Sequence, residues 1–361
     1  MGPRQTGKST LIESLSPELT INLNDESTFL DFKSNPAQLN EVLEAQKPKT
    51  VFIDEIQRHP SLLNTIQVIL DTQKKRAPKF YLTGSSARKL KRGQANLLPG
   101  RIFAYQMGGL SAAELDYKLN IKKSLKFGTL PEPYLHTNEA FITKHLATYA
   151  GTYLKEEIMA EALTRNLDGF SRFLHSAAKS AGLILDFSKL AKQAKIERKL
   201  CSRFYEILED TLLVNQVNVY EDTSADVVKR PKYYFFDVGV LNGLLGNFTA
   251  SSDRIGILFE HLVINQLYNS AKAHDKPIKI SYFRTRSGYE VDLIIELNKK
   301  IYAVEIKSGV VTQSEANKVL RLNEYTSKID QFFIVTIDSK HRNIDGVEIC
   351  SLNEFLKKIE L

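Results

Sequence analysis

The sequence predicts a multidomain α/β protein. Its 361 residues are more than one hydrophobic core ordinarily needs, so we expect at least two folded units. A glycine-rich loop at residues 2–9 leads into a helix, and apolar strands at 50–54 and 79–82 end in acidic or small polar residues. From residue 233 the chain is again rich in strands and includes a hairpin at 290–307. These observations predict a parallel sheet in the first third and a second α/β unit in the last third.

The composition excludes several classes of protein. Hydrophobic residues make up 43% and charged residues 25%, and no apolar run approaches the length of a membrane-spanning helix. Cys201 and Cys350 are too few for a disulfide framework or a cysteine zinc site, so we expect a reducing, cytoplasmic compartment and no membrane partner. The net charge of +7 is compatible with a polyanionic partner but does not identify one.

Residues 2–9 match the pattern G-x-x-x-x-G-K-S of a phosphate-binding loop. Glycines permit a tight turn in which backbone N–H groups face phosphate oxygens at the start of a helix. Lys8 would reach the β- and γ-phosphates of a nucleotide, and Ser9 would ligate Mg²⁺. The loop therefore predicts a site for ATP with Mg²⁺ as its cofactor.

Two later strands supply the companions of this loop. Asp54 would hold the Mg²⁺ shell, and Glu55 would orient and deprotonate the attacking water. Ser85 follows the strand at 79–82, where a hydroxyl could sense the γ-phosphate. Arg101 could act in trans as an arginine finger on the nucleotide of a neighbouring subunit, which predicts a homo-oligomer. Besides the catalytic candidates Lys8, Glu55 and Arg101, the residues expected at the nucleotide are Gly2, Pro3, Arg4, Gln5, Thr6, Gly7, Ser9, Thr10, Asp54 and Ser85.

Only Met1 precedes the loop, whereas a phosphate-binding loop normally follows a buried apolar strand. We therefore expect a parallel sheet that lacks its first strand, with unpaired backbone on the neighbouring strands. Two explanations stay open: the intact protein begins upstream, or the nucleotide site is incomplete.

The middle of the chain predicts helices and offers little chemistry. Residues 187–196 predict a short helix capped by Ser188, followed by a longer helix at 197–213 and a strand at 214–220. This order is typical of a winged helix-turn-helix. Six basic residues of this segment could contact phosphates if they share a face: Lys189, Lys192, Lys195, Arg198, Lys199 and Arg203. The alternative is a unit that packs between domains and leaves these charges in solvent.

The hairpin near the C-terminus brings acidic residues together. Strands at 290–297 and 301–307 flank a turn at 298–300, which places Asp292 opposite Glu305 and Lys307 on the same face. Two carboxylates at this spacing can bind Mg²⁺, and a nearby lysine can orient a water beside a phosphodiester. The alternative is a set of surface ion pairs that stabilise the sheet by about 0.2–1 kcal/mol each. The candidates for this second metal site are Glu260, Asp292, Glu305 and Lys307.

Together these residues resemble the prokaryotic AAA-type ATPases that carry a C-terminal domain called DUF4143, over nearly the whole chain. The resemblance rests on residues 2–9, 52–57, 82–86, 100–101, 233–239, 259–260, 290–292 and 305–307. It implies four regions: an ASCE-type P-loop NTPase domain at 1–110, a helical linker at 111–180, a winged-helix-like segment at 181–230, and a restriction-endonuclease-like domain of the PD-(D/E)XK type at 231–361. It does not imply a known substrate.

The function expected from these motifs is a Mg²⁺-dependent ATPase whose nucleotide state controls a DNA-facing C-terminal module. A first alternative is a metal-dependent nuclease with a vestigial phosphate-binding loop, in which the second metal site does the chemistry. A second alternative is a non-catalytic, nucleotide-gated adaptor whose winged helix and hairpin bind a protein.

Overall fold

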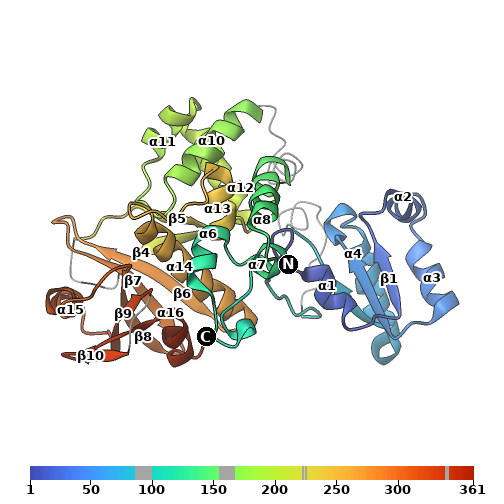
Figure 1. Cartoon of the computed structure of the whole chain (residues 1–361). Coiled ribbons are helices and arrows are strands. Elements are labelled where there is room, and N and C mark those ends of the chain that lie inside the picture. The colour runs from blue at the N-terminus through green and yellow to red at the C-terminus, as the bar shows by residue number, and fades with distance from the viewer. Residues whose placement is uncertain (86–99, 154–166, 222, 224–225, 338–340) are drawn as a thin grey trace. The chain divides into compact units, whose positions relative to one another are not determined.

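The computed structural model describes residues 1–85, 100–153, 167–221, 223, 226–337 and 341–361. The chain divides into two compact units, which we call the N-terminal unit (residues 1–107 with 210–212) and the C-terminal unit (108–209 with 213–361). Each unit has its own cluster of buried apolar side chains. Figure 1 labels their helices and strands.

The N-terminal unit is built on a parallel sheet. Within the described residues it has three strands, in the order β1-β2-β3: β1 (Leu19–Asn22), β2 (Thr50–Asp54) and β3 (Lys79–Leu82). The apolar residues of β2 are fully buried, as expected for a parallel strand covered on both faces. The helices of this unit are α1 (Lys8–Glu13), α2 (Glu26–Ser34), α3 (Gln38–Gln46) and α4 (Leu62–Gln73), and Figure 1 shows α2 and α3 next to β1. The predicted α/β class and parallel sheet are confirmed.

The first residues of the chain are held by backbone hydrogen bonds. The Gly2 N–H donates to the carbonyl of Gly84, which follows β3, at 3.3 Å. The Met1 ammonium donates to the Tyr105 carbonyl at 2.8 Å, and the Met1 carbonyl accepts from the Met107 N–H at 2.8 Å. Burial and the nearby charge of Lys8 lower the pKa of the Met1 amino group to about 6. The phosphate-binding loop therefore starts from a fixed point.

The C-terminal unit is built on a larger, mixed sheet. Among the described residues its strand order is β10-β11-β9-β8-β7-β6-β4-β5. The strands are β4 (Val214–Val219), β5 (Lys232–Phe235), β6 (Ile278–Arg284), β7 (Glu290–Leu297), β8 (Lys300–Lys307), β9 (Gln331–Thr336), β10 (Arg342–Ile344) and β11 (Val347–Ser351). This sheet contains the predicted hairpin as β7 and β8.

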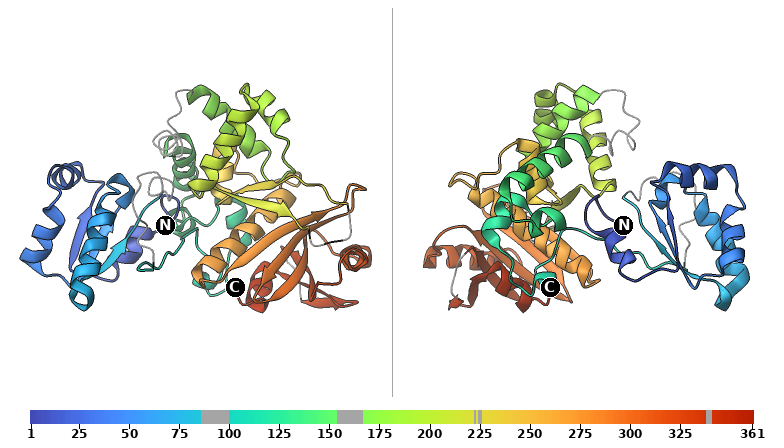
Figure 2. Two further views of the ribbon diagram at one scale, coloured as in Figure 1. Left: turned by 180° about the vertical axis from the view of Figure 1, so that it is seen from behind. Right: turned by 45° about the vertical axis from the view of Figure 1, so that its right-hand side comes forward.

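The C-terminal unit also contains the following helices. They are α6 (Ile121–Phe127), α7 (Pro131–Leu135), α8 (Glu139–Thr148), α10 (Leu167–Lys179), α11 (Phe187–Ala194), α12 (Arg198–Asp210), α13 (Val238–Leu245), α14 (Ile255–Ala273), α15 (Gln313–Leu320) and α16 (Leu352–Lys358). The long helix α14 buries most of its residues and contacts β5 and β8 (Figure 2). No helix in the described ranges combines the length and the apolar character needed to cross a bilayer.

The hairpin has the expected register but a shorter turn. Leu293 lies opposite Val304, which places Asp292 beside Glu305 at the next position. The turn consists of Asn298 and Lys299 alone, both with positive φ (51° and 65°), which is typical of a type I′ turn. Lys300, which we expected in the turn, already belongs to β8 and pairs with Leu297.

The cap predicted for α11 is wrong. Asp186, not Ser188, precedes the helix, and its carboxylate accepts hydrogen bonds from the N–H groups of Ser188 (2.9 Å) and Lys189 (3.0 Å). The helix begins at Phe187, as predicted, and the ring of this residue packs against Tyr205 of α12 with ring centroids 5.7 Å apart.

Both cysteines of the chain are free and buried in the C-terminal unit. Burial raises the pKa of the Cys201 thiol to about 11 and that of the Cys350 thiol to about 12. Neither thiol is ionised near neutral pH.

Candidate functional site

Two side chains of the glycine-rich loop donate hydrogen bonds to the Pro3 carbonyl of the same loop. Gly7 has φ 85°, a left-handed conformation that glycine adopts without strain, and it lets the chain turn directly into α1. The Thr6 hydroxyl donates to the Pro3 carbonyl at 3.0 Å, and the Lys8 ammonium donates to the same oxygen at 2.7 Å. Lys8 is only 7% exposed. Its charge is therefore held inside the loop, where it could exchange a carbonyl partner for a phosphate oxygen.

Asp54, at the end of β2, collects two hydroxyl groups. The Ser9 hydroxyl, from the second residue of α1, donates to both carboxylate oxygens, at 3.0 Å and 2.9 Å. The Thr83 hydroxyl, just beyond β3, donates to the first of these oxygens. A serine hydroxyl and an aspartate carboxylate are the oxygen ligands that Mg²⁺ prefers beside a nucleotide, so this pair fits the ion that the loop implies.

Glu55 is oriented by a residue whose role we did not predict. Its backbone has φ 58°, which turns the chain sharply after Asp54. The Gln57 amide donates to the Glu55 carboxylate and to the Ser85 hydroxyl, the latter at 3.0 Å. Gln57 is 6% exposed. Since Gln57 bonds both side chains, Glu55 and Ser85 lie close together at the ends of neighbouring strands.

Arg101 makes an ion pair within its own unit. Its guanidinium lies 2.5 Å from the Asp71 carboxylate of α4, and each side chain is about two-fifths exposed. The expected role of Arg101 in a neighbouring subunit stays a prediction.

The acidic hairpin lines a cleft of about 520 Å³ in the C-terminal unit. The Asp292 carboxylate accepts from the Ile306 N–H at 2.8 Å. Glu305 is 1% exposed, and one of its oxygens receives both Lys318 (2.7 Å) and Lys307 (3.0 Å). Its other oxygen, Oε2, has no hydrogen-bond partner among the described residues. Burial, followed by the charges of Glu305 and Glu260, raises the pKa of Asp292 well above its ordinary value.

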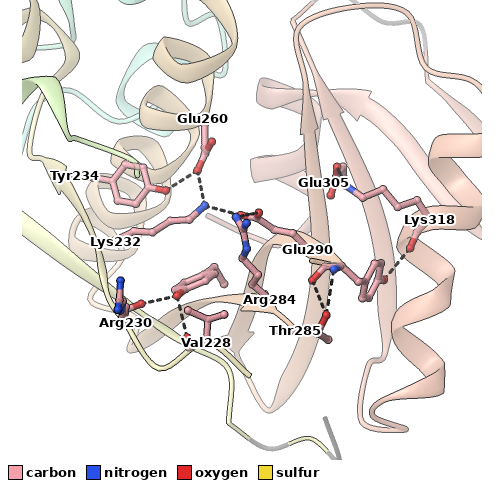
Figure 3. A network of polar contacts seen from close by, with 12 residues as sticks. Val228, Arg230, Lys232, Tyr234, Glu260, Arg284, Thr285, Glu290, Glu305 and Lys318 are labelled. Atoms are coloured by element: carbon pink, nitrogen blue, oxygen red, sulfur yellow. Dashed lines mark hydrogen bonds and ion pairs between the residues drawn. The ribbon is translucent and has the colours of Figure 1, made fainter. Parts of the chain in front are cut away.

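A buried lysine neutralises the other side of the cleft (Figure 3). The Lys232 ammonium of β5 lies 3.4 Å from Glu260 on α14 and 3.0 Å from Glu290 on β7. Tyr234 donates to the same Glu260 oxygen at 2.5 Å, and Arg284 pairs with Glu290 at 2.8 Å. Burial disfavours the charge of Lys232, but the two carboxylates outweigh it and raise its pKa.

The fold thus brings all four predicted residues of the second site, Glu260, Asp292, Glu305 and Lys307, to one cleft. It adds Lys232 and Lys318, which we did not predict because they come from β5 and α15. In the part of the chain that the structure describes, no three His, Cys, Asp or Glu side chains are arranged to hold a metal ion. The cleft carboxylates are instead held mainly by lysine and arginine.

The loop, the strand-end aspartate with its two hydroxyls and the adjacent glutamate give the N-terminal unit the arrangement of a P-loop nucleotide-binding domain. Comparison with family models agrees. Residues 1–116 match an AAA domain, residues 119–251 a domain of unknown function called DUF8612, and residues 255–355 the domain of unknown function DUF4143. The chain therefore carries an AAA domain at its N-terminus and DUF4143 at its C-terminus, as in AAA-type ATPases with a C-terminal DUF4143 domain.

Similar proteins include uncharacterised proteins of Mycobacterium bovis and Mycobacterium tuberculosis. Each is 26% identical over 322 residues, which cover 85% of this chain and 69% of the relative. A crystal structure of a Vibrio cholerae protein aligns with 95% of this chain and 96% of its own, at 13% identity and a TM-score of 0.24. That score is too low to establish a common fold.

Proposed function

We propose that this protein binds Mg-ATP in its N-terminal unit and hydrolyses it there. The observation that carries the proposal is the Ser9–Asp54–Thr83 cluster at the mouth of the loop, with Glu55 directly beside it. Mg²⁺ held by Ser9 and Asp54 would neutralise charge on the β- and γ-phosphates.

The side chains of this site divide the remaining work. Lys8 would contact the γ-phosphate, since its ammonium already lies inside the loop. Glu55 would accept a proton from the attacking water, with its carboxylate positioned by Gln57. Ser85 would report the state of the γ-phosphate through the same Gln57 amide. Arg101 of a second copy would complete the site in a homo-oligomer.

The test is ATP turnover by the full chain. We expect Lys8→Ala to abolish ATP binding and Glu55→Gln to abolish turnover while ATP still binds. Lys33→Ala and Glu44→Gln are matched controls because both side chains are exposed on α2 and α3. Turnover that survives in both Lys8→Ala and Glu55→Gln would overturn the proposal.

We further propose that the C-terminal unit faces DNA through a winged-helix-like segment and that the nucleotide state controls this contact. Helices α11 and α12 are followed by β4, which pairs antiparallel with β5. All six predicted basic residues of this segment are exposed, as phosphate contacts require. The two free cysteines fit a cytoplasmic protein.

Duplex binding at increasing salt tests this part of the proposal. Changing Lys192, Lys195 and Lys199 to Gln should weaken duplex binding and reduce the slope of log affinity against log salt by about 2–3. Changing Lys118, Lys300 and Lys357, which are also exposed, is the control. Equal affinities of the two triple variants would argue for the adaptor function instead.

A second candidate function is metal-dependent nuclease activity. It is favoured by Glu305 Oε2, which has no hydrogen-bond partner in the described part of the chain, and by the raised pKa of Asp292. Glu305 and Asp292 would hold a divalent cation, which would supply positive charge to both carboxylates. The cation could then activate a water for phosphodiester cleavage, as in restriction-endonuclease-like enzymes. Mn²⁺- or Mg²⁺-dependent nicking of plasmid DNA that disappears in Asp292→Asn, but persists in Glu296→Gln on the same strand, would support it. A lack of cleavage with every metal and substrate tried would count against it.

A further inference from the structure

A basic groove lies between α10 and α11. It has a volume of about 510 Å³, and its lining includes Arg172, Lys179 and Lys189. All three side chains are exposed. The groove also contains one carboxylate, Asp186, but that group already accepts the two N–H groups at the start of α11 and lies 3.4 Å from Arg230. The groove therefore presents net positive charge.

The basic groove and the acidic cleft share a wall. Leu183 and Ile184 line both of them. The segment that carries these residues is fixed to β5: the Gly182 N–H donates to the Tyr233 carbonyl at 2.9 Å, and the Leu185 N–H donates to the Pro231 carbonyl at 2.9 Å. Because β5 also carries Lys232, which lines the cleft, the same strand holds residues of both the basic groove and the cleft in place.

The shared wall is apolar and reaches solvent. The Leu183 side chain is 52% exposed although its neighbours on both sides are held by hydrogen bonds. On the far side of this wall, Lys318 and Lys307 surround Glu305 with side chains that are 40% and 28% exposed. Positive groups thus lie on both sides of a single exposed leucine.

We propose that a single-stranded polynucleotide binds along the basic groove, passes over Leu183 and enters the cleft. This inference deepens the DNA-facing part of the proposed function and rests on it. A phosphate backbone matches the net positive charge of the groove. At the cleft end of the path, Lys307 and Lys318 pair with Glu305 but stay partly exposed, and the apolar side chain between the two hollows offers a surface for the face of a base. The volumes of the two hollows, about 510 Å³ for the groove and 520 Å³ for the cleft, are in the range of sites that hold small ligands, which includes a nucleotide.

The test measures binding of labelled oligothymidylate and oligouridylate of about 20 nucleotides to the full chain by fluorescence anisotropy, with a duplex as comparison. The variant Arg172→Glu/Lys179→Glu changes two groove cations that do not belong to the proposed duplex contacts. It should weaken single-strand binding at least tenfold and lower its salt slope by about 1.4. Lys118→Glu/Lys300→Glu carries the same charge change at exposed positions outside the lining of both hollows and should stay within twofold.

Two further variants test the path. Leu183→Ala should weaken single-strand binding about five- to tenfold without changing the salt slope, because it removes an apolar contact and no charge. Lys318→Gln should weaken binding with the groove intact, which tests the cleft end. Equal losses on the two oligonucleotides would support recognition of any single strand, and a loss on one alone would assign DNA or RNA.

The outcomes separate this inference from the proposed function. If the groove variants bind single strands normally while the Lys192/Lys195/Lys199 variant loses duplex binding, the inference falls and the DNA-facing proposal stands. An equal loss of duplex and single-strand binding in the groove variants would also overturn the single-strand path. If no variant of either set changes binding, both fall.

Discussion

Gln57 is the residue that joins the two polar strand ends of the nucleotide site. Its amide reaches Glu55 and Ser85, so replacing it by leucine should leave the glutamate present but misplaced. We expect Gln57→Leu to lower ATP turnover about 10- to 100-fold, with the dissociation constant for ATP changed less than threefold. Turnover assays beside equilibrium binding of a fluorescent ATP analogue measure the two effects. A variant with normal turnover would show that Glu55 needs no positioning.

Asp237 predicts a dependence of stability on pH. Burial outweighs its backbone hydrogen bonds from Thr129 and Val240 and raises its pKa to about 6, from 3.8. The folded protein therefore holds this proton when the unfolded chain has lost it. Protonated Asp237 therefore contributes about 3 kcal/mol to the free energy of unfolding below pH 4, and this contribution is lost as the pH rises through 6.

Urea unfolding between pH 4 and pH 7 measures this dependence. The amide side chain of the variant Asp237→Asn cannot ionise. The free energy of unfolding of this variant, minus that of the native protein, should therefore rise by about 3 kcal/mol between pH 4 and pH 7. Parallel pH profiles of the two proteins would contradict the prediction.

At the scale of elements, α13 approaches the end of α6 closely. A Cβ atom on Gly239 would lie 2.1 Å from the carbonyl oxygen of Phe127, the last residue of α6. We therefore expect Gly239→Ala to lower the free energy of unfolding by about 1–3 kcal/mol. Gly256→Ala is the control, since its nearest neighbour would lie 3.8 Å away and alanine favours the helix. Thermal and urea unfolding compare the two, and equal stabilities would refute the close contact.

Lys232 ties together β5, α14 and β7. Lys232→Met would leave Glu260 and Glu290 facing each other without their shared cation, so we expect a loss of about 3 kcal/mol in unfolding free energy. Adding Glu260→Gln should restore part of it. By contrast, Lys279→Met removes a cation that is 68% exposed in its pair with Glu296 and should cost less than about 1 kcal/mol. Equal losses would contradict the buried role of Lys232.

Elements defined by short-range patterns could be predicted from the sequence. The strand at 79–82 and the register that pairs Asp292 with Glu305 follow from apolar alternation, although the hairpin turn is one residue shorter than predicted. The predicted cap of α11 is wrong because a capping residue precedes the first helical residue, which makes it Asp186, whereas Ser188 is the second residue of the helix. What local pattern does not contain is contacts between distant segments, such as the packing of Phe187 on Tyr205.

The same limit applies to the two sites. The sequence predicts Lys8, Ser9, Asp54 and Glu55 as site residues because they belong to two short motifs, the loop at residues 2–9 and an apolar strand that ends in two acids. Lys232 lies 28 residues before its partner Glu260, and Lys318 lies 13 residues after its partner Glu305. Only the packing of the elements that carry these lysines brings them to the cleft. The only sequence signal for Lys232 is a lysine that begins an otherwise aromatic strand, Tyr233-Tyr234-Phe235.

At the scale of the whole molecule, the proposed control of DNA contact by nucleotide implies a reciprocal coupling. If ATP changes the affinity for DNA, saturating DNA must change the affinity for ATP by the same factor. We expect the affinities for duplex DNA with a non-hydrolysable ATP analogue and with ADP to differ at least fivefold. Anisotropy titrations in both directions measure this, and Lys8→Ala should abolish it. Identical DNA affinities in the two nucleotide states would separate the functions of the two units.

The buried cysteines make this protein convenient for site-specific labelling. Because both native thiols are shielded and their pKa values lie near 11 and 12, maleimide at neutral pH should react selectively with a cysteine introduced at an exposed position such as Lys300. A second introduced cysteine in the N-terminal unit, at the exposed Glu44, would add a partner dye. Energy transfer between the dyes would then test whether the distance between the two units differs between nucleotide states, without first removing a native cysteine.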